Sequence, residues 1–254
     1  MTDHIKIERI KSARITPMRA IGYVRSDFPA KFGIPRQSGL VDTRAEVVLV
    51  PPYNQPEAVR GLTDFSHVWL LWEFSENVRE DGSWSATVRP PRLGGNVRKG
   101  VFATRSPFRP NPIGLSCVKL EGISFEEEGT VLHVTGADLM DGTPVYDIKP
   151  YVAYSDSIPD AAGGFTEKVR DYRLAVEIPQ PLLEKIPREL QETVRQLLAQ
   201  DPRPSYQEDP ERIYGMPYGG MDLRFRVEEG TLTVVSVEPF QPETEAGQEK
   251  KRKK

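Results

Sequence analysis

The sequence predicts a mainly β protein with a β-barrel over residues 20–157 and a small α+β domain over residues 166–240. In the first part, short runs of apolar and β-branched residues alternate with turns rich in Gly, Pro, Asn and Asp. Only one brief helix is predicted there, and strands at this spacing are typical of a barrel or a folded-over sheet. The later part adds an amphipathic helix. Charged, polar extensions at 1–19 and 241–254 flank the two domains, and the second should be disordered.

The first predicted strands are Ala20–Val24, Ala45–Val50 and His67–Phe74. The last of these is apolar at nearly every position, which favours a strand buried on both faces. A short helix is predicted over Pro56–Leu62, because proline is tolerated in the first turn of a helix.

Short strands are predicted next at Ala86–Val88 and Val101–Ala103. A hairpin follows, with strands Leu115–Phe125 and Thr130–Ala137 joined around a glycine turn. A turn and one more strand complete the barrel within 138–151.

After a linker over residues 158–165, the pattern changes. We predict a strand at Leu174–Ile178 and a helix over Pro187–Gln200, whose leucines and valine fall on one face. A second hairpin joins Asp222–Val227 and Thr231–Val237.

Composition narrows the function classes. The formal net charge is −3 and no apolar run approaches membrane-spanning length. Charges occupy the N-terminal residues where a secretory signal needs an apolar run, so we expect a cytoplasmic protein. One cysteine and three widely separated histidines favour neither a disulfide nor a metal centre. The dinucleotide-binding glycine motif, the P-loop and the catalytic-triad signatures are all absent from the sequence.

Positive charge is concentrated in one segment. No Asp or Glu occurs from Gly82 to Lys119, although acids are more than half of the charged residues of the chain. The segment holds Arg89, Arg92, Arg98, Lys99, Arg105, Arg109 and Lys119. Such a concentration in a slightly acidic protein indicates a phosphate-bearing partner.

Three loops at predicted strand ends carry polar residues fixed by Pro and Gly: 32–40, 105–112 and 138–150. In the second, three prolines restrict the backbone, so that Arg105, Arg109 and Asn111 are held at little further entropic cost. Each loop alone is better explained by an ordinary turn whose polar residues satisfy backbone groups. Their joint occurrence near several cations predicts one pocket, within one chain or between two copies.

The motifs IPRQSGLV, VRPPRLGGN, GVFATRSPFRPNPIGLS, DLMDGTPVYDIKPY and QDPRPSY resemble the TsaA-like, or TrmO, family of tRNA methyltransferases. The resemblance runs from about Ala20 to Tyr151 and continues more weakly through the C-terminal domain. It implies a β-barrel unlike the Rossmann-type methyltransferase sheet, S-adenosylmethionine as cofactor, and a homodimer with the cofactor near its interface. The implied reaction methylates the exocyclic N6 of threonylcarbamoyladenosine, next to the anticodon of threonine tRNA.

The resemblance also implies which residues hold the cofactor. They are Pro35, Arg36, Gln37, Ser75, Glu76, Arg105, Leu115, Asp138, Leu139, Met140 and Asp141. Family members often have His where this chain has Ser75. Asp138 or Asp141 would face the positive groups of the cofactor, and Arg36 or Arg105 would pair with its carboxylate.

An adenine exocyclic nitrogen is a poor nucleophile because its lone pair is delocalised, so a base or hydrogen-bond acceptor is useful. Asp141, Asn111 and Asp147 are the candidates, in that order. Arg109 or Lys149 would meet the threonyl carboxylate of the substrate. Arg89, Arg92, Arg98 and Lys99 would contact phosphates of the anticodon stem-loop, and Tyr146 or Tyr151 would stack on a base or, equally, serve as core rings.

Two alternatives stay open from the sequence. A non-catalytic RNA-binding module on the same barrel would bind RNA without any dependence on the cofactor. A related methyltransferase would act on a small molecule or on another RNA.

Overall fold

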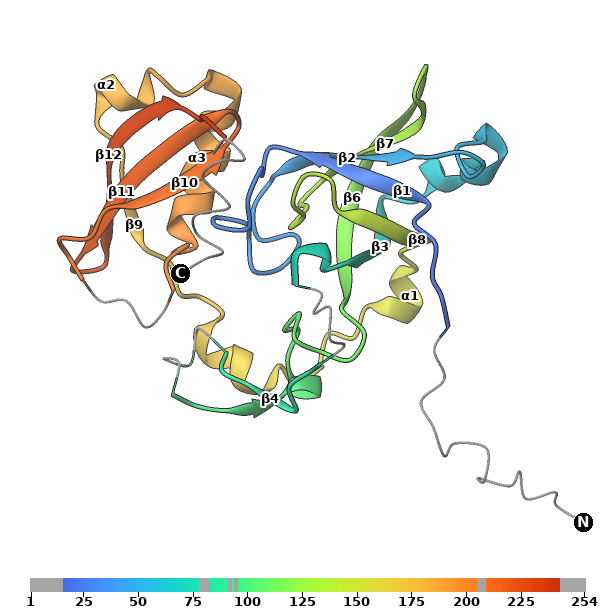
Figure 1. Ribbon diagram of the computed structural model, residues 1–254, viewed down its shortest axis with the longest axis horizontal. Coiled ribbons are helices and arrows are strands. Elements are labelled where there is room, and N and C mark those ends of the chain that lie inside the picture. The colour runs from blue at the N-terminus through green and yellow to red at the C-terminus, as the bar shows by residue number, and fades with distance from the viewer. Residues whose placement is uncertain (1–15, 78–82, 91–92, 94–95, 205–208, 243–254) are drawn as a thin grey trace, which may run out of the picture.

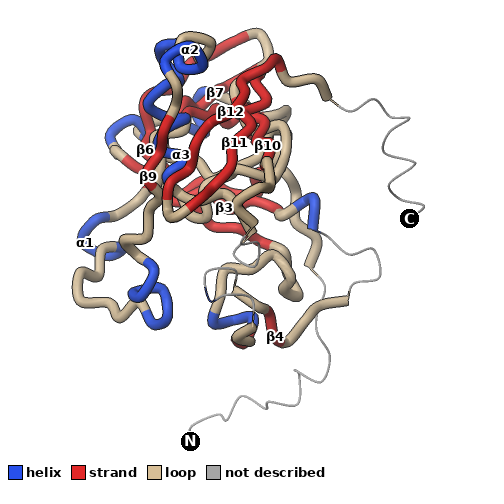
Figure 2. Tube along the Cα trace, turned by 90° about the vertical axis from the view of Figure 1, so that its left-hand side faces the viewer, coloured by secondary structure: helices blue, strands red, loops and turns tan. Residues whose placement is uncertain are grey.

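A computed structural model describes residues 16–77, 83–90, 93, 96–204 and 209–242. A closed β-barrel and a separate four-stranded sheet lie beside each other, and a small two-stranded arm extends below them (Figure 1). The view turned by 90° also places this arm below the rest of the described chain (Figure 2).

The barrel confirms the predicted β architecture. Its strands follow the order β1-β2-β7-β6-β3-β8, and every neighbouring pair is antiparallel. The strand bounds are β1 Gly22–Ser26, β2 Arg44–Leu49, β3 His67–Glu73, β6 Ile113–Glu126, β7 Gly129–Thr135 and β8 Pro144–Pro150. The long β6 and β7 form the predicted hairpin around its glycine turn.

Burial along β3 differs from the prediction that both faces are covered. Val68, Leu70 and Trp72 are buried, whereas the alternate residues of this strand are only partly covered. A barrel is one sheet with one interior, so successive side chains point alternately into the core and onto the outer wall. The apolar residues on the outer positions, Trp69 and Leu71, therefore form part of an open wall.

Helical turns replace two of the predicted elements. The predicted helix at Pro56–Leu62 is a pair of 3-10 helices, Pro56–Val59 and Leu62–Asp64. Val101–Ala103, predicted as a strand, is also a 3-10 helix (η6), because an apolar run this short does not distinguish a strand from a helical turn. Thr104 Oγ1 closes this turn by donating to the Val101 carbonyl at 2.9 Å.

The arm is the two-stranded sheet of β4 (Thr87–Val88) and β5 (Lys99–Gly100). Sequence patterns did not predict four further short helices of the described chain, which are Ser75–Asn77 (η4), Ala153–Asp156 (α1), Gly164–Val169 (η7) and Gln180–Leu183 (α2).

The C-terminal unit confirms the predicted helix and hairpin. Its sheet has the order β10-β11-β12-β9, with β9 parallel to β12. The bounds are β9 Ala175–Glu177, α2 Gln180–Leu183, the 3-10 helix Arg188–Leu190, α3 Gln191–Ala199, β10 Tyr214–Tyr218, β11 Met221–Glu228 and β12 Thr231–Pro239. Strand β10 was not predicted, because Gly215 and Pro217 interrupt its pattern.

Two apolar cores support these units. One fills the barrel, and the other lies under the C-terminal sheet and helix α3. The second core also contains Phe28 and Val41, which belong to the loop between β1 and β2. No helix in the described ranges is long and apolar enough to cross a membrane.

Candidate active site

Two of the three predicted loops meet beside strand β6. Arg105 donates a hydrogen bond from Nη1 to Oε1 of Gln37. The next residue, Ser38, accepts a hydrogen bond at Oγ from the backbone N–H of Cys117, at 3.1 Å. Strand β7 pairs with β6 only from Lys119 onward, so the edge of β6 before this point is open to the loop.

The third loop joins them through Asp138. Its Oδ1 accepts a hydrogen bond from Ser116 Oγ at 2.5 Å, and Ser116 Oγ in turn accepts one from Trp72 Nε1 at 2.9 Å. Burial raises the pKa of Asp138 to about 6. Ser116, the backbone N–H groups of Asp138 and Ser38, and the charge of Arg105 oppose that increase.

Ser116 and Trp72 belong to the site although neither is among the predicted site residues. Ser116 is fully buried, and a serine inside an otherwise apolar strand is a signal that it holds a polar partner. Trp72 reaches it because Gly114 leaves room: a Cβ at Gly114 would lie 2.1 Å from Cε2 of the indole. The interior of the barrel therefore fixes the position of Asp138.

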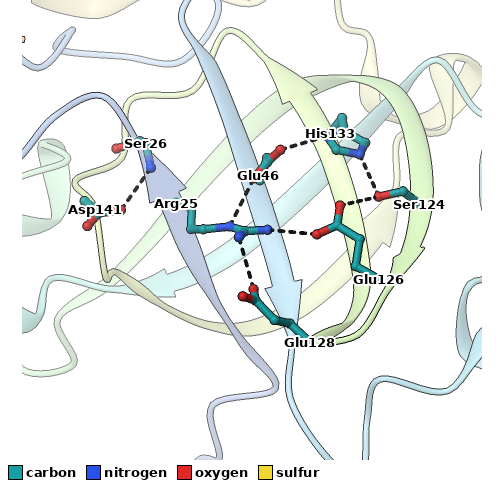
Figure 3. Close-up of polar contacts among 8 residues, drawn as sticks. All are labelled: Arg25, Ser26, Glu46, Ser124, Glu126, Glu128, His133 and Asp141. Atoms are coloured by element: carbon teal, nitrogen blue, oxygen red, sulfur yellow. Dashed lines mark hydrogen bonds and ion pairs between the residues drawn. The ribbon is translucent and has the colours of Figure 1, made fainter. Parts of the chain in front are cut away.

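Arg36 and Asp141 contact other parts of the chain. Arg36 Nη2 donates to the carbonyls of Asp201 and Arg203, at 3.4 and 3.2 Å. Asp141 lies exposed at the end of β1, where its Oδ1 accepts from the backbone N–H of Ser26 at 3.1 Å (Figure 3). The predicted convergence of loops is thus formed by Gln37, Arg105 and Asp138.

Side chains of the turn from Asp138 to Asp141 differ in exposure, from the buried Leu139 to the exposed Asp141. Leu139 is 1% exposed and belongs to the barrel core, so its side chain is closed to a ligand. Ser26 Oγ donates to the Leu139 carbonyl at 2.9 Å, and Thr143 Oγ1 donates to the Met140 carbonyl at 2.7 Å. These bonds hold the turn between the end of β1 and the start of β8.

Pro35, Ser75 and Glu76 complete the predicted cofactor set. Pro35 is buried, whereas Ser75 and Glu76 are exposed in η4, directly after β3. Lys31 Nζ donates to the Glu76 carbonyl at 2.7 Å and lies 3.9 Å from its carboxylate. The loop after β1 therefore contacts the end of β3 as well as β6.

The outer wall of β6, β3 and β8 carries other predicted residues. Leu115 of β6 is 50% exposed and pairs with Leu71 of β3. Leu71 in turn pairs with Asp147 of β8. Asp147 forms an ion pair with Lys149, with Oδ2 and Nζ 2.7 Å apart. Neither residue is therefore free to act as a single isolated charge.

Tyr146 lies at a β-bulge of this wall. The register of β8 with β3 shifts between Leu71 and Trp72, so Tyr146 is the extra residue. Burial and a hydrogen bond with Glu73 raise the pKa of Tyr146 to about 12. Glu73, which sequence reasoning missed, thereby fixes a predicted substrate-binding side chain.

The predicted phosphate-binding residues that the structure describes belong to the two-stranded arm. Arg89 and Arg98 are exposed on the arm, and Arg98 Nη1 donates to Thr87 Oγ1 at 2.9 Å. Lys99 Nζ lies 5.9 Å from the centre of the Phe165 ring. Arg92 lies outside the described residues.

Two residues of the Pro-rich loop have different environments. Arg109 Nη2 donates to the carbonyls of Thr104 and Val101, at 3.2 and 3.5 Å, and so stabilises its own loop. Asn111 is exposed, and its carbonyl accepts from the backbone N–H of Ile113 at 2.8 Å. Arg109 therefore acts as an internal brace of the Pro-rich loop.

A separate charged cluster covers the barrel strands β1, β2, β6 and β7. Arg25 lies among the carboxylates of Glu46, Glu126 and Glu128, and His133 Nδ1 lies 3.1 Å from Glu46 (Figure 3). The groups are substantially exposed, so solvent screens each ion pair. We assign this cluster to the stability of the barrel.

The side chains at the β6 edge fit the cofactor that the family resemblance implies. Asp138 offers an anion to a sulfonium or ammonium group, Arg105 offers a cation to a carboxylate, and the exposed Leu115 offers apolar surface. Over the described part of the chain, no group of three or more His, Cys, Asp or Glu residues is arranged to hold a metal ion.

Comparisons with known proteins agree with this fold. The family model described as the tRNA-methyltransferase O N-terminal domain matches residues 23–157, and that of the TrmO C-terminal domain matches 172–240. The tRNA (adenine(37)-N6)-methyltransferase of Escherichia coli K12 is 44% identical over 228 residues, covering 86% of this chain and 96% of that protein.

A Methanothermobacter thermautotrophicus protein named "Probable S-adenosyl-L-methionine-binding protein" is 38% identical over 141 residues, covering 56% of this chain and 93% of its own length. A crystal structure of TrmO from P. aeruginosa has a TM-score of 0.72 and 37% identity, and covers 91% of this chain and 100% of that chain. The chain therefore belongs to the tRNA-methyltransferase O family.

Proposed function

We propose that this chain is an S-adenosylmethionine-dependent methyltransferase that modifies the exocyclic N6 of adenosine 37 in tRNA. The finer proposal is that the target is threonylcarbamoyladenosine next to the anticodon of threonine tRNA. The observation that carries the proposal is the junction of three loops at the open edge of β6, through Gln37, Arg105 and Asp138. Its chemistry suits a ligand with both positive and negative groups.

S-adenosylmethionine, when bound, supplies a methyl group carried on a positively charged sulfur. Asp138 is mostly ionised at neutral pH, since its pKa is about 6, and its carboxylate attracts the positive end of this ligand. Arg105, oriented by Gln37, pairs with a carboxylate. The remaining predicted contacts come from the exposed side chains of Ser75, Glu76 and Leu115 and from the backbone of Leu139 and Met140.

The same residues align donor and acceptor, which is the main demand of an in-line methyl transfer. Asp141 is the first candidate to accept the proton from the target nitrogen, because its carboxylate is exposed beside the Asp138 turn. Asn111 is the second candidate and acts as a hydrogen-bond acceptor. Asp147 is third, since its carboxylate is already in contact with Lys149.

The two-stranded arm and the 3-10 helix η6 that follows it form the proposed tRNA face. Arg89, Arg98 and Lys99 would contact phosphates of the tRNA, and we propose the same role for Arg92, which lies outside the described residues. Trp84 and Phe102 are stacked on this arm with ring centres 6.1 Å apart, and are 47% and 74% exposed. Exposed aromatic rings among cations suit unpaired loop bases.

Residues of the outer wall and of the Pro-rich loop are proposed to position the substrate near the methyl group that is transferred. Lys149 and Arg109 are the proposed cations for the threonyl carboxylate, although each already has partners in this chain. Tyr146, held by Glu73, is the proposed stacking surface for the base.

We also propose a homodimer and a cytoplasmic location. The apolar residues of the outer wall, Trp69, Leu71 and Leu115, support a second copy packing against β3 and β6, because in one chain they remain partly exposed. The cytoplasm is where a tRNA substrate is available.

The test is a nucleoside digest. Unmodified and threonylcarbamoylated threonine tRNA are incubated with the protein and methyl-labelled S-adenosylmethionine, and the nucleosides are separated by mass spectrometry. We expect the label on threonylcarbamoyladenosine alone. Tight RNA binding without any transfer would support a non-catalytic RNA-binding module, and label on another nucleoside or small molecule would support a related methyltransferase.

A further inference from the structure

We infer that the C-terminal unit positions the cofactor loop, so that its packing sets the affinity of the barrel for S-adenosylmethionine. The relationship runs through residues 27–42, here called the bridging segment, which leave the barrel after β1 and return at β2. The inference rests on the proposed function, because it takes Gln37 and Ser38 as part of the cofactor site.

The bridging segment is part of the C-terminal core. Phe28 and Val41 are buried in the same apolar cluster as the sheet and helix α3, and Phe32 and Ile34 pack against it. The Phe28 and Tyr218 rings have centres 4.8 Å apart. The segment therefore closes the C-terminal core while it is covalently part of the barrel.

Polar contacts fasten both ends of the bridging segment. The Asp27 carbonyl accepts from the backbone N–H of Gly219 at 3.0 Å. At the other end, the backbone N–H of Asp42 donates to Gln196 Oε1 at 3.2 Å, and its carbonyl accepts from Thr193 Oγ1 at 3.4 Å. The first contact is with the turn after β10 and the other two are with α3.

The middle of the segment is fixed in the same way. Arg36 donates to the Asp201 and Arg203 carbonyls, as described above. Gly33 lies against Met216 of β10 so closely that a Cβ would be 2.4 Å from Met216 Cγ. Its φ of +97° is in addition a conformation that suits glycine.

The residues that follow in this segment reach the site. Gln37 orients Arg105, and Ser38 contacts both β6 and the carboxylate of Asp138. With both ends and the middle held by the C-terminal unit, the loop has little freedom to move independently of β10. Ordering the loop before the cofactor arrives removes an entropic cost of binding, so loosening β10 should weaken binding.

By thermodynamic linkage, the coupling between the packing of β10 and cofactor binding must act in both directions. If the packing of β10 favours cofactor binding, then the cofactor must stabilise β10 by the same factor. Backbone amides of Met216 and Tyr218 should accordingly exchange their hydrogens more slowly when S-adenosylmethionine is present. This effect would occur on a strand that supplies no residue to the proposed site.

The experiment compares two truncations of the same core in the full chain. Met216→Ala removes the side chain that packs on Gly33, whereas Leu232→Ala truncates β12, which lies toward the opposite edge of the sheet from β10. Calorimetric titration with S-adenosylmethionine is run at a temperature where both variants are folded. We expect Met216→Ala to weaken binding about 5- to 10-fold, and Leu232→Ala less than about twofold.

Gly33→Ala, which strains the same contact from the loop side, should also weaken binding. Equal affinities for wild type, Met216→Ala and Gly33→Ala would overturn the inference while leaving the proposed function in place. No binding by the wild type would contradict the proposed function itself, and the inference with it. If both variants fail to fold, hydrogen exchange of the wild type decides: unchanged protection of β10 on adding cofactor contradicts the inference.

Discussion

The hydroxyl of Ser116 donates a 2.5 Å hydrogen bond to the Asp138 carboxylate, joining a strand of the barrel wall to the turn after β7. Trp72 completes the connection from the interior, since its Nε1 donates to the same hydroxyl at 2.9 Å. The charge at the candidate site is thus oriented by a buried polar chain. The first three predictions test the parts of that chain.

The contribution of Asp138 to the free energy of unfolding should decrease as the pH rises. Its folded-state pKa of about 6 lies above its ordinary value of 3.8, so the folded protein binds the proton more tightly than the unfolded chain. Its contribution is fully present below about pH 4 and is lost as the pH rises through about 6. Urea unfolding of the wild type and of Asp138→Asn at several pH values measures this difference. If the wild type and Asp138→Asn differ in free energy of unfolding by the same amount at pH 4 and pH 7, the raised pKa of Asp138 is ruled out.

Ser116→Ala should lower the free energy of unfolding by about 1–3 kcal/mol, because it leaves the buried Trp72 indole N–H without its acceptor. It should also raise the pKa of Asp138 further, because the Ser116 hydroxyl stabilises the ionised carboxylate and the variant lacks it. Thermal unfolding gives the first quantity, and a pH titration of Asp138 by NMR gives the second. Ser157→Ala, at an exposed position outside the barrel strands, is the control and should change neither.

Gly114→Ala should destabilise the barrel by about 1–3 kcal/mol, because the added methyl overlaps the Trp72 ring. Gly122 is the matched control on strand β6, since a Cβ there meets nothing within 4 Å. Denaturant midpoints of the two variants test the prediction. Similar losses for both would mean that Trp72 does not pack against Gly114.

Arg98→Ala and Lys99→Ala should each weaken tRNA binding and reduce its salt dependence by a slope of about one. Affinity for S-adenosylmethionine should stay at the wild-type value, because the arm is separate from the β6 edge. Arg60→Ala, an exposed arginine on the barrel, is the control. Fluorescence anisotropy with the anticodon stem-loop at several salt concentrations measures the slope, and unchanged slopes would exclude the arm from the RNA face.

The barrel could be predicted from the sequence because turn residues and β-branched runs act locally. The alternating burial of β3 and the 3-10 turn at Val101–Ala103 could not, since apolar content alone does not say which face a core will cover. Strand β10 was missed because Gly215 and Pro217 oppose a strand locally and only packing against β11 favours it.

The candidate site could be predicted at the level of loops and less well at the level of residues. Proline and glycine patterns identified the three loops that meet at β6, and the resemblance supplied Gln37, Arg105 and Asp138. Which neighbour points inward is decided by contacts distant in sequence, such as those of Arg36 with Asp201 and Arg203. Ser116, Trp72 and Glu73 act through tertiary partners that no sequence spacing reveals.

The central claim is that these three loops form one cofactor site serving methyl transfer to tRNA. Its most direct test is the transfer of labelled methyl to threonylcarbamoylated threonine tRNA by wild type, Arg105→Ala and Asp138→Asn, with calorimetric affinity for S-adenosylmethionine measured in parallel. We predict transfer by the wild type, and for both variants an affinity at least about tenfold weaker, with transfer falling accordingly. Wild-type affinity and transfer rate in both variants would contradict the account.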